Sequence, residues 1–307
     1  NVINIYYTKR NDLSYTVNYL EKNTNKVLQT PKIQGGQTFE SVIESRNEVI
    51  EINGYNFDSF DKEQLKIGTG ENVINIYYTK RNDLSYTVNY LEKGTNEVIH
   101  LAKTKENQVF ETVIKSSEEV IEIDGYNFVS SDKETLTIGT GENVINLYYT
   151  KREDLSYTVN YLEKGTDTVL HTPKTVSDQT FGTVITSENE KIQIDGYNFD
   201  SFDKESLIIG TKENVINIYY TKRTDLSYTV NYLEKGTDTV LHNPKTVPNQ
   251  TFGDVITSEN EKIDIDGYNF DSFDKESLII GTGENVINIY YTKRTDLSYT
   301  VNYLEKG

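Results

Sequence analysis

The chain is built on one sequence period, and that period limits the possible folds more than any other feature. The block YTVNYLEK recurs every 71 residues, beginning at Tyr15, Tyr86, Tyr157, Tyr228 and Tyr299. Four complete units follow from this spacing: 15–85, 86–156, 157–227 and 228–298. The overall length alone would indicate about two domains. A repeat of this length instead predicts four small domains in series.

The two ends of the sequence carry parts of the same unit. Residues 1–14 match the end of a unit, and residues 299–307 match its beginning. We therefore expect the parent protein to continue the pattern in both directions. The third and fourth units differ at only six positions, which indicates recent duplication.

Composition excludes several kinds of site. The chain contains no Cys, Met or Trp, which excludes disulfides, thiolate metal sites and thiol catalysis. With 31 Lys and Arg against 48 Asp and Glu, the net charge is -17. This charge argues against binding to nucleic acids or anionic membranes, because both attract basic surfaces. No apolar run approaches the ~20 residues of a membrane-spanning helix.

The first half of each unit predicts two strands and a short helix. In the fourth unit, alternating bulky and polar residues over 228–233 predict a half-buried strand. Residues 239–247 predict a second, weaker strand that Pro244 interrupts. Residues 251–258 carry apolar side chains at the i, i+3 and i+4 spacing of a short helix, with Thr251 as its cap.

The second half of the unit predicts three strands. Ile263 and Ile265 begin a strand and point inward, before a bend at Gly267. Residues 277–280 and 286–292 then predict a hairpin with a loop of about five residues. The order strand, strand, short helix, strand, strand, strand predicts one sheet with a helix across one face, an α+β arrangement.

Taken in order, these segments resemble a known family. The opening YTVNYLEK, the central IDGYNF and the closing NVINIYYTKR are similar to the MucBP (mucin-binding protein) repeat of Gram-positive surface proteins. The likeness covers all four units, and the chain is also similar to listerial B-repeats. The resemblance implies small ubiquitin-like β-grasp domains, tandem arrays on the cell wall, and adhesion to mucins or other host glycans. It implies no catalytic residues.

A β-grasp fold would determine how such an array extends. Its first and last strands lie parallel and adjacent, so successive domains would run head to tail as an elongated rod. Strands of about 8–10 residues give units of ~35 Å, and roughly 140 Å for four. The joint between Tyr291 and Tyr299 contains no Gly or Pro, which predicts a stiff connection. A leucine in every joint packs either between neighbouring domains or within one domain. These leucines are Leu13, Leu84, Leu155, Leu226 and Leu297.

Several patterns that can carry chemistry have simpler interpretations. His100, His171 and His242 share a repeat position that holds Gln29 in the first unit, which disfavours a shared metal or catalytic role. The acidic stretch 264–274 lacks the EF-hand spacing, so we interpret it as a solvated turn rather than a calcium site. An intramolecular Lys–Asn isopeptide bond is a further alternative, although sequence cannot pair its residues. No cofactor or metal is predicted.

The most informative polar pattern is a set of Asn and Tyr residues. Alternation places Tyr290 and Asn288 on the outward face of the last strand, beside Asn231 on the first strand. Such a face can bind sugars, because aromatic rings stack on sugar rings and amides hydrogen-bond to hydroxyl groups. The alternative is that Tyr290 covers neighbouring aliphatic atoms. The candidate glycan-facing residues are Tyr77, Tyr148, Tyr219, Tyr290, Asn18, Asn89, Asn160, Asn231, Asn75, Asn146, Asn217 and Asn288.

The sequence leaves three functions open. The first is a non-enzymatic stalk of an extracellular bacterial surface adhesin, anchored to the cell wall through regions outside this sequence and projecting a distal binding domain. The second makes each repeat a mucin- or glycan-binding module. The third is a filament or biofilm-matrix repeat that self-assembles through exposed sheet edges. No nucleophile and base recur together, so no enzyme is predicted. The expected partners are host mucin or other glycans and further copies of the chain.

Overall fold

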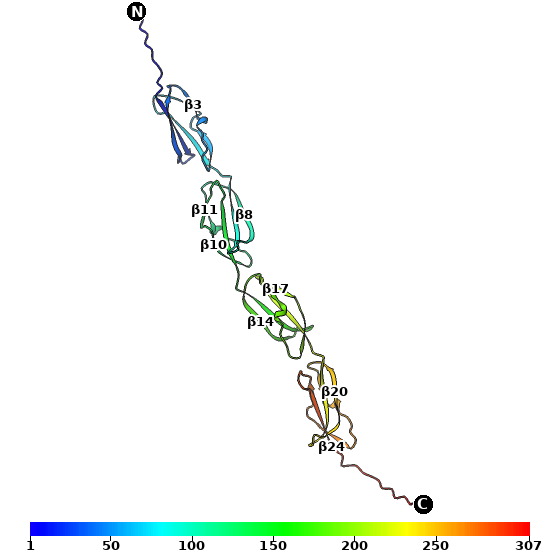
Figure 1. The fold of residues 1–307 in the computed structure, drawn as a ribbon. Coiled ribbons are helices and arrows are strands. Elements are labelled where there is room, and N and C mark those ends of the chain that lie inside the picture. The colour runs from blue at the N-terminus through cyan, green and yellow to red at the C-terminus, as the bar shows by residue number, and fades with distance from the viewer. The chain divides into compact units, whose positions relative to one another are not determined.

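The computed structural model describes residues 1–307, and the four repeats are drawn in Figure 1. The chain divides into two compact units, residues 1–151 and 152–307, with two repeats in each. Every repeat has six strands and a 3-10 helix of four residues. Repeat 1 contains β1 (Leu13–Glu21), β2 (Val27–Gln37), β3 (Val42–Glu44), η1 (Ser45–Glu48), β4 (Tyr55–Phe60), β5 (Gln64–Lys66) and β6 (Val73–Lys80). Repeat 2 contains β7 (Leu84–Glu92), β8 (Val98–Gln108), β9 (Val113–Lys115), η2 (Ser116–Glu119), β10 (Tyr126–Ser131), β11 (Thr135–Thr137) and β12 (Val144–Lys151).

The second compact unit has the same elements. Repeat 3 contains β13 (Leu155–Glu163), β14 (Val169–Gln179), β15 (Val184–Thr186), η3 (Ser187–Glu190), β16 (Tyr197–Phe202), β17 (Ser206–Ile208) and β18 (Val215–Lys222). Repeat 4 contains β19 (Leu226–Glu234), β20 (Val240–Gln250), β21 (Val255–Thr257), η4 (Ser258–Glu261), β22 (Tyr268–Phe273), β23 (Ser277–Ile279) and β24 (Val286–Lys293).

The main sheet of each repeat has four strands around a parallel central pair. In repeat 1 the order is β2-β1-β6-β4, and only β1 and β6 are parallel. Asn18 lies directly across from Asn75 in this pair. The other three sheets have the corresponding orders β8-β7-β12-β10, β14-β13-β18-β16 and β20-β19-β24-β22. The first and last strands are therefore parallel neighbours, as predicted.

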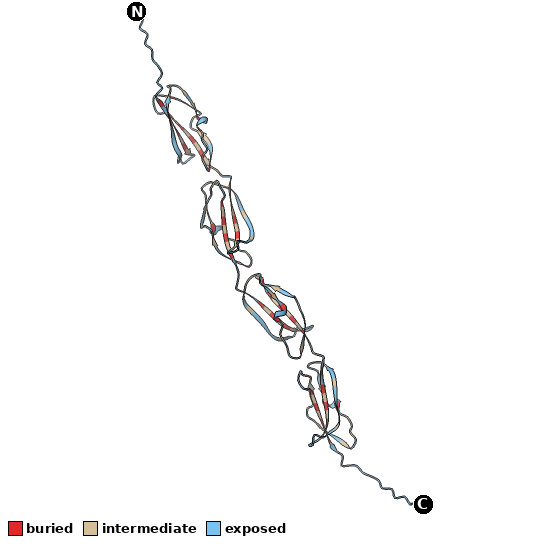
Figure 2. Cartoon of the chain, viewed as in Figure 1, coloured by how far each residue is buried: buried red, intermediate tan, exposed pale blue.

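The core of each repeat lies on one face of this sheet. In repeat 1, Tyr15 and Val17 from β1 and Ile74 and Ile76 from β6 are buried in one apolar cluster. The buried positions follow the central strands in every repeat (Figure 2). The two-stranded sheet formed by β3 and β5 lies in the connections between the main strands, and its Ile43 packs against the same cluster. The alternation predicted for the first and last strands is confirmed.

The short helix predicted for 251–258 is wrong. This segment forms a turn, then strand β21, and the only helix of the repeat is the 3-10 helix η4 that follows. Gly253 has a φ of 82°, which an α-helix does not accommodate. Val255 is exposed while Ile256 is half-buried, so the segment alternates as a strand. Each repeat is mostly β, as expected, but its single helix is a 3-10 helix of four residues in place of the short helix expected across the sheet.

The predicted hairpin between 277–280 and 286–292 is also wrong. β23 pairs with β21, whereas β24 pairs with β19 and β22. The segment between β23 and β24 is closed by Asn285, whose side chain accepts a hydrogen bond from the Gly281 amide (2.9 Å) and donates to the Ser227 carbonyl (3.1 Å). This asparagine ties the connection to the start of β19.

Three other local predictions can be compared with the structure. The strand expected to begin at Ile263 begins instead at Tyr268, after the bend at Gly267. Pro244 does not interrupt a strand, because β20 runs through it from Val240 to Gln250. β20 is an edge strand, where proline is tolerated. Four of the five joint leucines begin the first strand of a repeat and are buried in the core of that same repeat: Leu13, Leu84, Leu155 and Leu226. The local interpretation holds for these four, whereas Leu297 lies outside any strand and is exposed.

Candidate functional site

The predicted asparagines form a hydrogen-bonded row across the outward face of each sheet. Asn18 Nδ2 donates to Asn75 Oδ1 at 2.8 Å across the parallel pair. Asp61 accepts two hydrogen bonds from Asn75, from its backbone amide at 3.0 Å and from Nδ2 at 3.1 Å. Rows of the same composition occur at Asn89–Asn146–Asp132, Asn160–Asn217–Asp203 and Asn231–Asn288–Asp274. The amides are thus partly engaged with one another, although each amide has further donor or acceptor capacity.

The predicted tyrosines lie beside this row. Tyr77 is half-buried on the outward face, directly across from Leu20 on β1 and from Ser59 on β4. The equivalent rings of Tyr148, Tyr219 and Tyr290 are half-buried as well. The structure therefore brings all twelve predicted residues to one kind of face, one Asn–Asn pair and one Tyr in each repeat. Sequence reasoning missed the aspartate of the row, although Asp recurs at this position in every unit.

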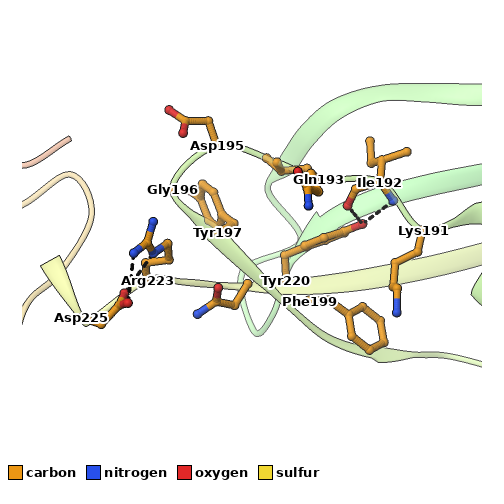
Figure 3. A pocket seen from close by; sticks show the side chains of 12 residues that line it. Lys191, Ile192, Gln193, Asp195, Gly196, Tyr197, Phe199, Tyr220, Arg223 and Asp225 are labelled. Atoms are coloured by element: carbon orange, nitrogen blue, oxygen red, sulfur yellow. Dashed lines mark hydrogen bonds and ion pairs between the residues drawn. The ribbon is translucent and has the colours of Figure 1, made fainter. Parts of the chain in front are cut away.

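An open groove in repeat 3 is a second candidate site, which the sequence did not reveal. It has a volume of about 820 Å³ and lies between segment 191–196 and β16 (Figure 3). The Tyr220 hydroxyl holds that segment, donating to the Ile192 carbonyl at 2.8 Å and accepting from the Ile192 amide at 3.2 Å. Repeat 1 has the corresponding groove, of about 750 Å³, along residues 49–57. A groove of this size can accommodate a small ligand.

The groove in repeat 3 has an aromatic end and an ionic end. The Lys191 ammonium lies 4.5 Å from the ring centre of Phe199, which is 38% exposed. At the other end, the Arg223 guanidinium donates hydrogen bonds to both carboxylate oxygens of Asp225, at 2.9 and 3.0 Å. These hydrogen bonds lower the pKa of Asp225. Such groups can stack on a ligand and form hydrogen bonds to it.

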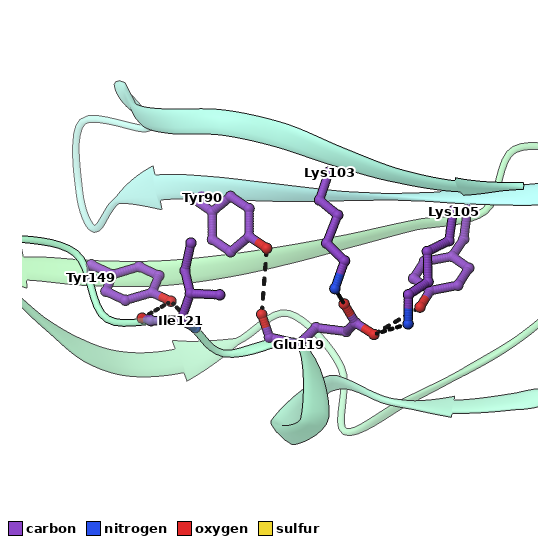
Figure 4. A network of polar contacts seen from close by, with 7 residues as sticks. Tyr90, Lys103, Lys105, Glu119, Ile121 and Tyr149 are labelled. Carbon is purple, nitrogen blue, oxygen red and sulfur yellow. Dashed lines mark hydrogen bonds and ion pairs between the residues drawn. The ribbon is translucent and has the colours of Figure 1, made fainter.

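A buried polar network lies inside each repeat, shown for repeat 2 in Figure 4. Glu119, at the end of η2, is 4% exposed, accepts a hydrogen bond from the Tyr86 hydroxyl at 2.7 Å, and pairs with Lys103 at 2.6 Å. Burial of Tyr86 raises the pKa of its hydroxyl group most, and the hydrogen bond to Glu119 raises it further. Burial also opposes ionisation of Glu119, but hydrogen bonds from Lys103 and Tyr86 outweigh it and lower the pKa of this carboxyl group. The network fixes η2 against β7 and β8.

The histidines and the acidic turn lie at the surface. His100 is exposed, with its ring edge-on to Tyr90 at a centroid distance of 5.3 Å. Asp271, within the stretch interpreted as a solvated turn, instead lies in strand β22 and pairs with Lys235. The structure contains no cluster of three or more His, Cys, Asp or Glu residues suited to a metal ion. It also contains no helix with the length and apolar character needed to cross a membrane.

The fold and its repeated faces define a class of tandem, mostly β repeat proteins, and comparison with known proteins identifies the family. The MucBP domain family matches residues 15–79, 86–150, 157–221 and 228–292. The chain therefore belongs to the MucBP domain family, whose members are non-enzymatic repeat or binding domains of Gram-positive cell-surface proteins.

Two solved structures are similar to parts of the chain. One is a pair of Streptococcal High Identity Repeats in Tandem (SHIRT) domains, domains 3-4 of a cell surface protein, at 14% identity and a TM-score of 0.21, covering 46% of this chain and 98% of that chain. The other is Mub-RV, at 13% identity and a TM-score of 0.18, covering 46% of this chain and 99% of that chain. No curated protein matches the chain.

Proposed function

We propose that the chain is the non-enzymatic stalk of a bacterial surface adhesin, in which the repeats set the distance between the cell wall and a distal binding domain. The parallel pairing of β1 and β6 carries this proposal. Thr16 lies across from Val73, and Glu21 lies across from Tyr78. The chain therefore enters a repeat at one end of the central pair and leaves at the other. Each added repeat would then add about one strand length.

The internal organisation of each repeat supports the same proposal. A sheet of order β2-β1-β6-β4 with a parallel central pair supports a ubiquitin-like β-grasp fold. Each repeat has a separate apolar cluster, which supports four domains that fold on their own, over 15–85, 86–156, 157–227 and 228–298. The length of the array would then rise with the number of repeats.

Short joints favour a rod over a flexible string. β6 ends at Lys80 and β7 begins at Leu84, so only residues 81–83 connect the two strands. Within it, the Arg81 guanidinium donates hydrogen bonds to both carboxylate oxygens of Asp83, each at 2.9 Å. A short joint restrained in this way has little freedom to bend.

Charge favours separation of the repeats. Residues 228–298 carry 12 acidic and 6 basic side chains, a net charge of -6. Like-charged domains repel one another, which keeps an array soluble and disfavours its collapse. Repulsion also opposes misfolding between neighbours of nearly identical sequence, a known failure of repeat arrays. In this proposal the wall anchor and the distal domain belong to regions outside the sequence described here.

The second candidate function is direct binding of mucin or other glycans by each repeat. The repeated Asn–Tyr face favours it, because one array would present the same weak site four times, and linked weak sites gain avidity. The grooves beside Phe57 and Phe199 offer a second place for a sugar ring to stack.

A glycan array with one-repeat and four-repeat proteins distinguishes the two functions. The stalk proposal predicts no binding by either protein. Binding that rises steeply from one repeat to four would support the glycan-binding function instead. Sedimentation velocity on the same proteins tests the spacer role, because the frictional ratio of a stalk rises with each added repeat. A frictional ratio that stays constant would contradict the stalk.

A further inference from the structure

A phenylalanine of repeat 2 lies against the end of repeat 1. The Phe110 ring packs edge-on to Tyr55, with ring centres 5.6 Å apart and planes at 70°. It also covers Gly54 so closely that a Cβ atom at Gly54 would lie 2.4 Å from the ring. Gly54 has a φ of 82°, so both its backbone conformation and the ring above it require glycine.

The joint residue Arg81 connects the backbones of the same two repeats. Its amide donates to the Gly54 carbonyl of repeat 1 at 2.9 Å, and its carbonyl accepts from the Phe110 amide of repeat 2 at 2.8 Å. A side-chain hydrogen bond, from Thr140 Oγ1 to Asn53 Oδ1 at 2.8 Å, adds a third link. The Phe110–Tyr55 contact and these hydrogen bonds thus connect the two repeats on either side of the joint 81–83.

The joint between repeats 3 and 4 has the same arrangement. Phe252 packs edge-on to Tyr197 at 5.6 Å and 64°, and a Cβ atom at Gly196 would lie 2.4 Å from its ring. Arg223 donates to the Gly196 carbonyl and accepts from the Phe252 amide, both at 2.9 Å. Thr282 Oγ1 donates to Asp195 Oδ1 at 2.7 Å. The arrangement therefore belongs to the repeat and not to one pair of neighbours.

The last repeat carries the same turn with nothing packed on it. Gly267 has a φ of 77°, close to that of Gly54, but a Cβ atom at Gly267 would meet no heavy atom within 4 Å. Arg294 still donates to the Gly267 carbonyl at 2.9 Å. Half of the joint is therefore formed before any following repeat is present.

We propose that the Asn/Asp-Gly-Tyr turn of each repeat is a docking site whose partner is the phenylalanine-bearing turn of the next repeat, another copy of the same module. Docking holds neighbouring repeats at a fixed angle, which a joint restrained only by its length would not do. This inference deepens the proposed stalk function and rests on it for its biological meaning. With flexible joints, the length of the stalk would still rise with the number of repeats. The stalk proposal can therefore hold even when the docking proposal is wrong.

The test measures the distance between repeats 1 and 2 in the full chain. Because the chain has no cysteine, Arg46→Cys and Ser117→Cys place two spin labels at equivalent exposed positions of the two repeats. Double electron–electron resonance then gives the distribution of their separation. We expect one narrow peak for the chain with labels only, and a peak roughly twofold broader after Phe110→Ala, because weakly joined domains move relative to one another.

Phe39→Ala is the matched control. Phe39 occupies the same position in repeat 1 and packs on the core of that repeat, but no preceding repeat is present in the chain. Its replacement therefore reports the loss of a core contact without loss of a joint. We expect the peak width to stay unchanged. Circular dichroism on each variant shows whether the repeats remain folded.

A second pair of variants covers the case in which Phe110→Ala unfolds repeat 2. Gly54→Ala forces the Phe110 ring away, whereas Gly267→Ala carries the same backbone strain with no ring above it. We expect broadening for Gly54→Ala only. A peak as narrow as that of the unsubstituted chain in both Phe110→Ala and Gly54→Ala would overturn the proposal. Broadening after Phe39→Ala equal to that after Phe110→Ala would overturn it as well.

Discussion

Tyr86 donates its hydroxyl hydrogen to Oε1 of Glu119 at 2.7 Å inside repeat 2. The same pair occurs in the other repeats as Tyr15–Glu48, Tyr157–Glu190 and Tyr228–Glu261, at 2.9 to 3.0 Å. A buried carboxylate is tolerated only when it is hydrogen-bonded or paired. The pair therefore fixes the one 3-10 helix of each repeat to the first strand of the sheet.

Removing this hydroxyl group should destabilise repeat 2. Tyr86→Phe leaves the Glu119 carboxylate buried with one donor fewer, so we expect a loss of about 1–3 kcal/mol in the free energy of unfolding, as for hydrogen bonds to charged groups. Tyr148→Phe is the control, because that side chain lies half-buried on the outward face. Hydrogen exchange of peptides unique to repeat 2 measures both variants. Equal protection from hydrogen exchange in the two variants would contradict the structural role of the Tyr86–Glu119 pair.

The buried tyrosines should make the protein sensitive to alkali. Burial and the hydrogen bond to Glu261 raise the pKa of Tyr228 to about 12, above its ordinary value of 10.0. Between these values the unfolded state releases a proton that the folded state retains, so stability is complete below pH ~10 and falls as the pH rises toward 12. The pKa of Lys174, raised by its hydrogen bond to Glu190, acts in the same direction.

Thermal unfolding between pH 8 and 12, with tyrosinate absorbance recorded in parallel, measures this effect; these limits bracket the ordinary tyrosine pKa of roughly 10. Exposed tyrosines should ionise first, and the buried ones only as the repeats unfold. Ionisation of all the tyrosines in a single step near the ordinary pKa, with no loss of structure, would refute the expectation.

Asn285 should be essential to repeat 4. Its side chain is 8% exposed and hydrogen-bonds to Gly281 and to the Ser227 carbonyl. Asn285→Ala leaves these backbone groups without partners, and we expect a cost of about 2–4 kcal/mol. Asn269→Ala, at an exposed position of β22, should cost less than ~0.5 kcal/mol. Urea unfolding of a single-repeat protein measures both, and similar midpoints for the two variants would contradict the assigned role.

The outward face can be tested as a glycan site directly. If it binds sugars, replacing Tyr77, Tyr148, Tyr219 and Tyr290 together by Ser should weaken binding to a glycan surface at least about tenfold, because four linked contacts are lost. Replacing Phe57 and Phe199 by Ser removes the aromatic end of each groove instead. Undiminished binding in the tyrosine variant would reject the face, and loss in the phenylalanine variant would assign binding to the grooves.

Local alternation in the sequence predicted the central strands correctly. Tyr228, Val230 and Tyr232 point into the core, as do Ile287 and Ile289, because a half-buried strand requires a period of two. The helix prediction failed for a physical reason. Phe252, Val255 and Ile256 match a helical spacing only by coincidence, and the positive φ of Gly253 ends any helix there.

The features that position the sites depend on contacts between distant residues. Ser277–Ile279 and Val286–Lys293 are neighbours in sequence, which favours a hairpin, but β23 pairs with β21 instead. The partner of Phe110 is Tyr55, in another repeat, and no local pattern identifies it. The groove beside Phe199 likewise forms only where segment 191–196 folds back over Tyr220.

Small-angle X-ray scattering on proteins of one, two and four repeats tests the stalk most directly. We predict that the maximum dimension rises by the same increment, about 35 Å, with each repeat, because each repeat adds its central strands, roughly 30 Å long, and part of a joint. A four-repeat particle with a radius of gyration near the ~19 Å of a globular protein of this length would contradict the account.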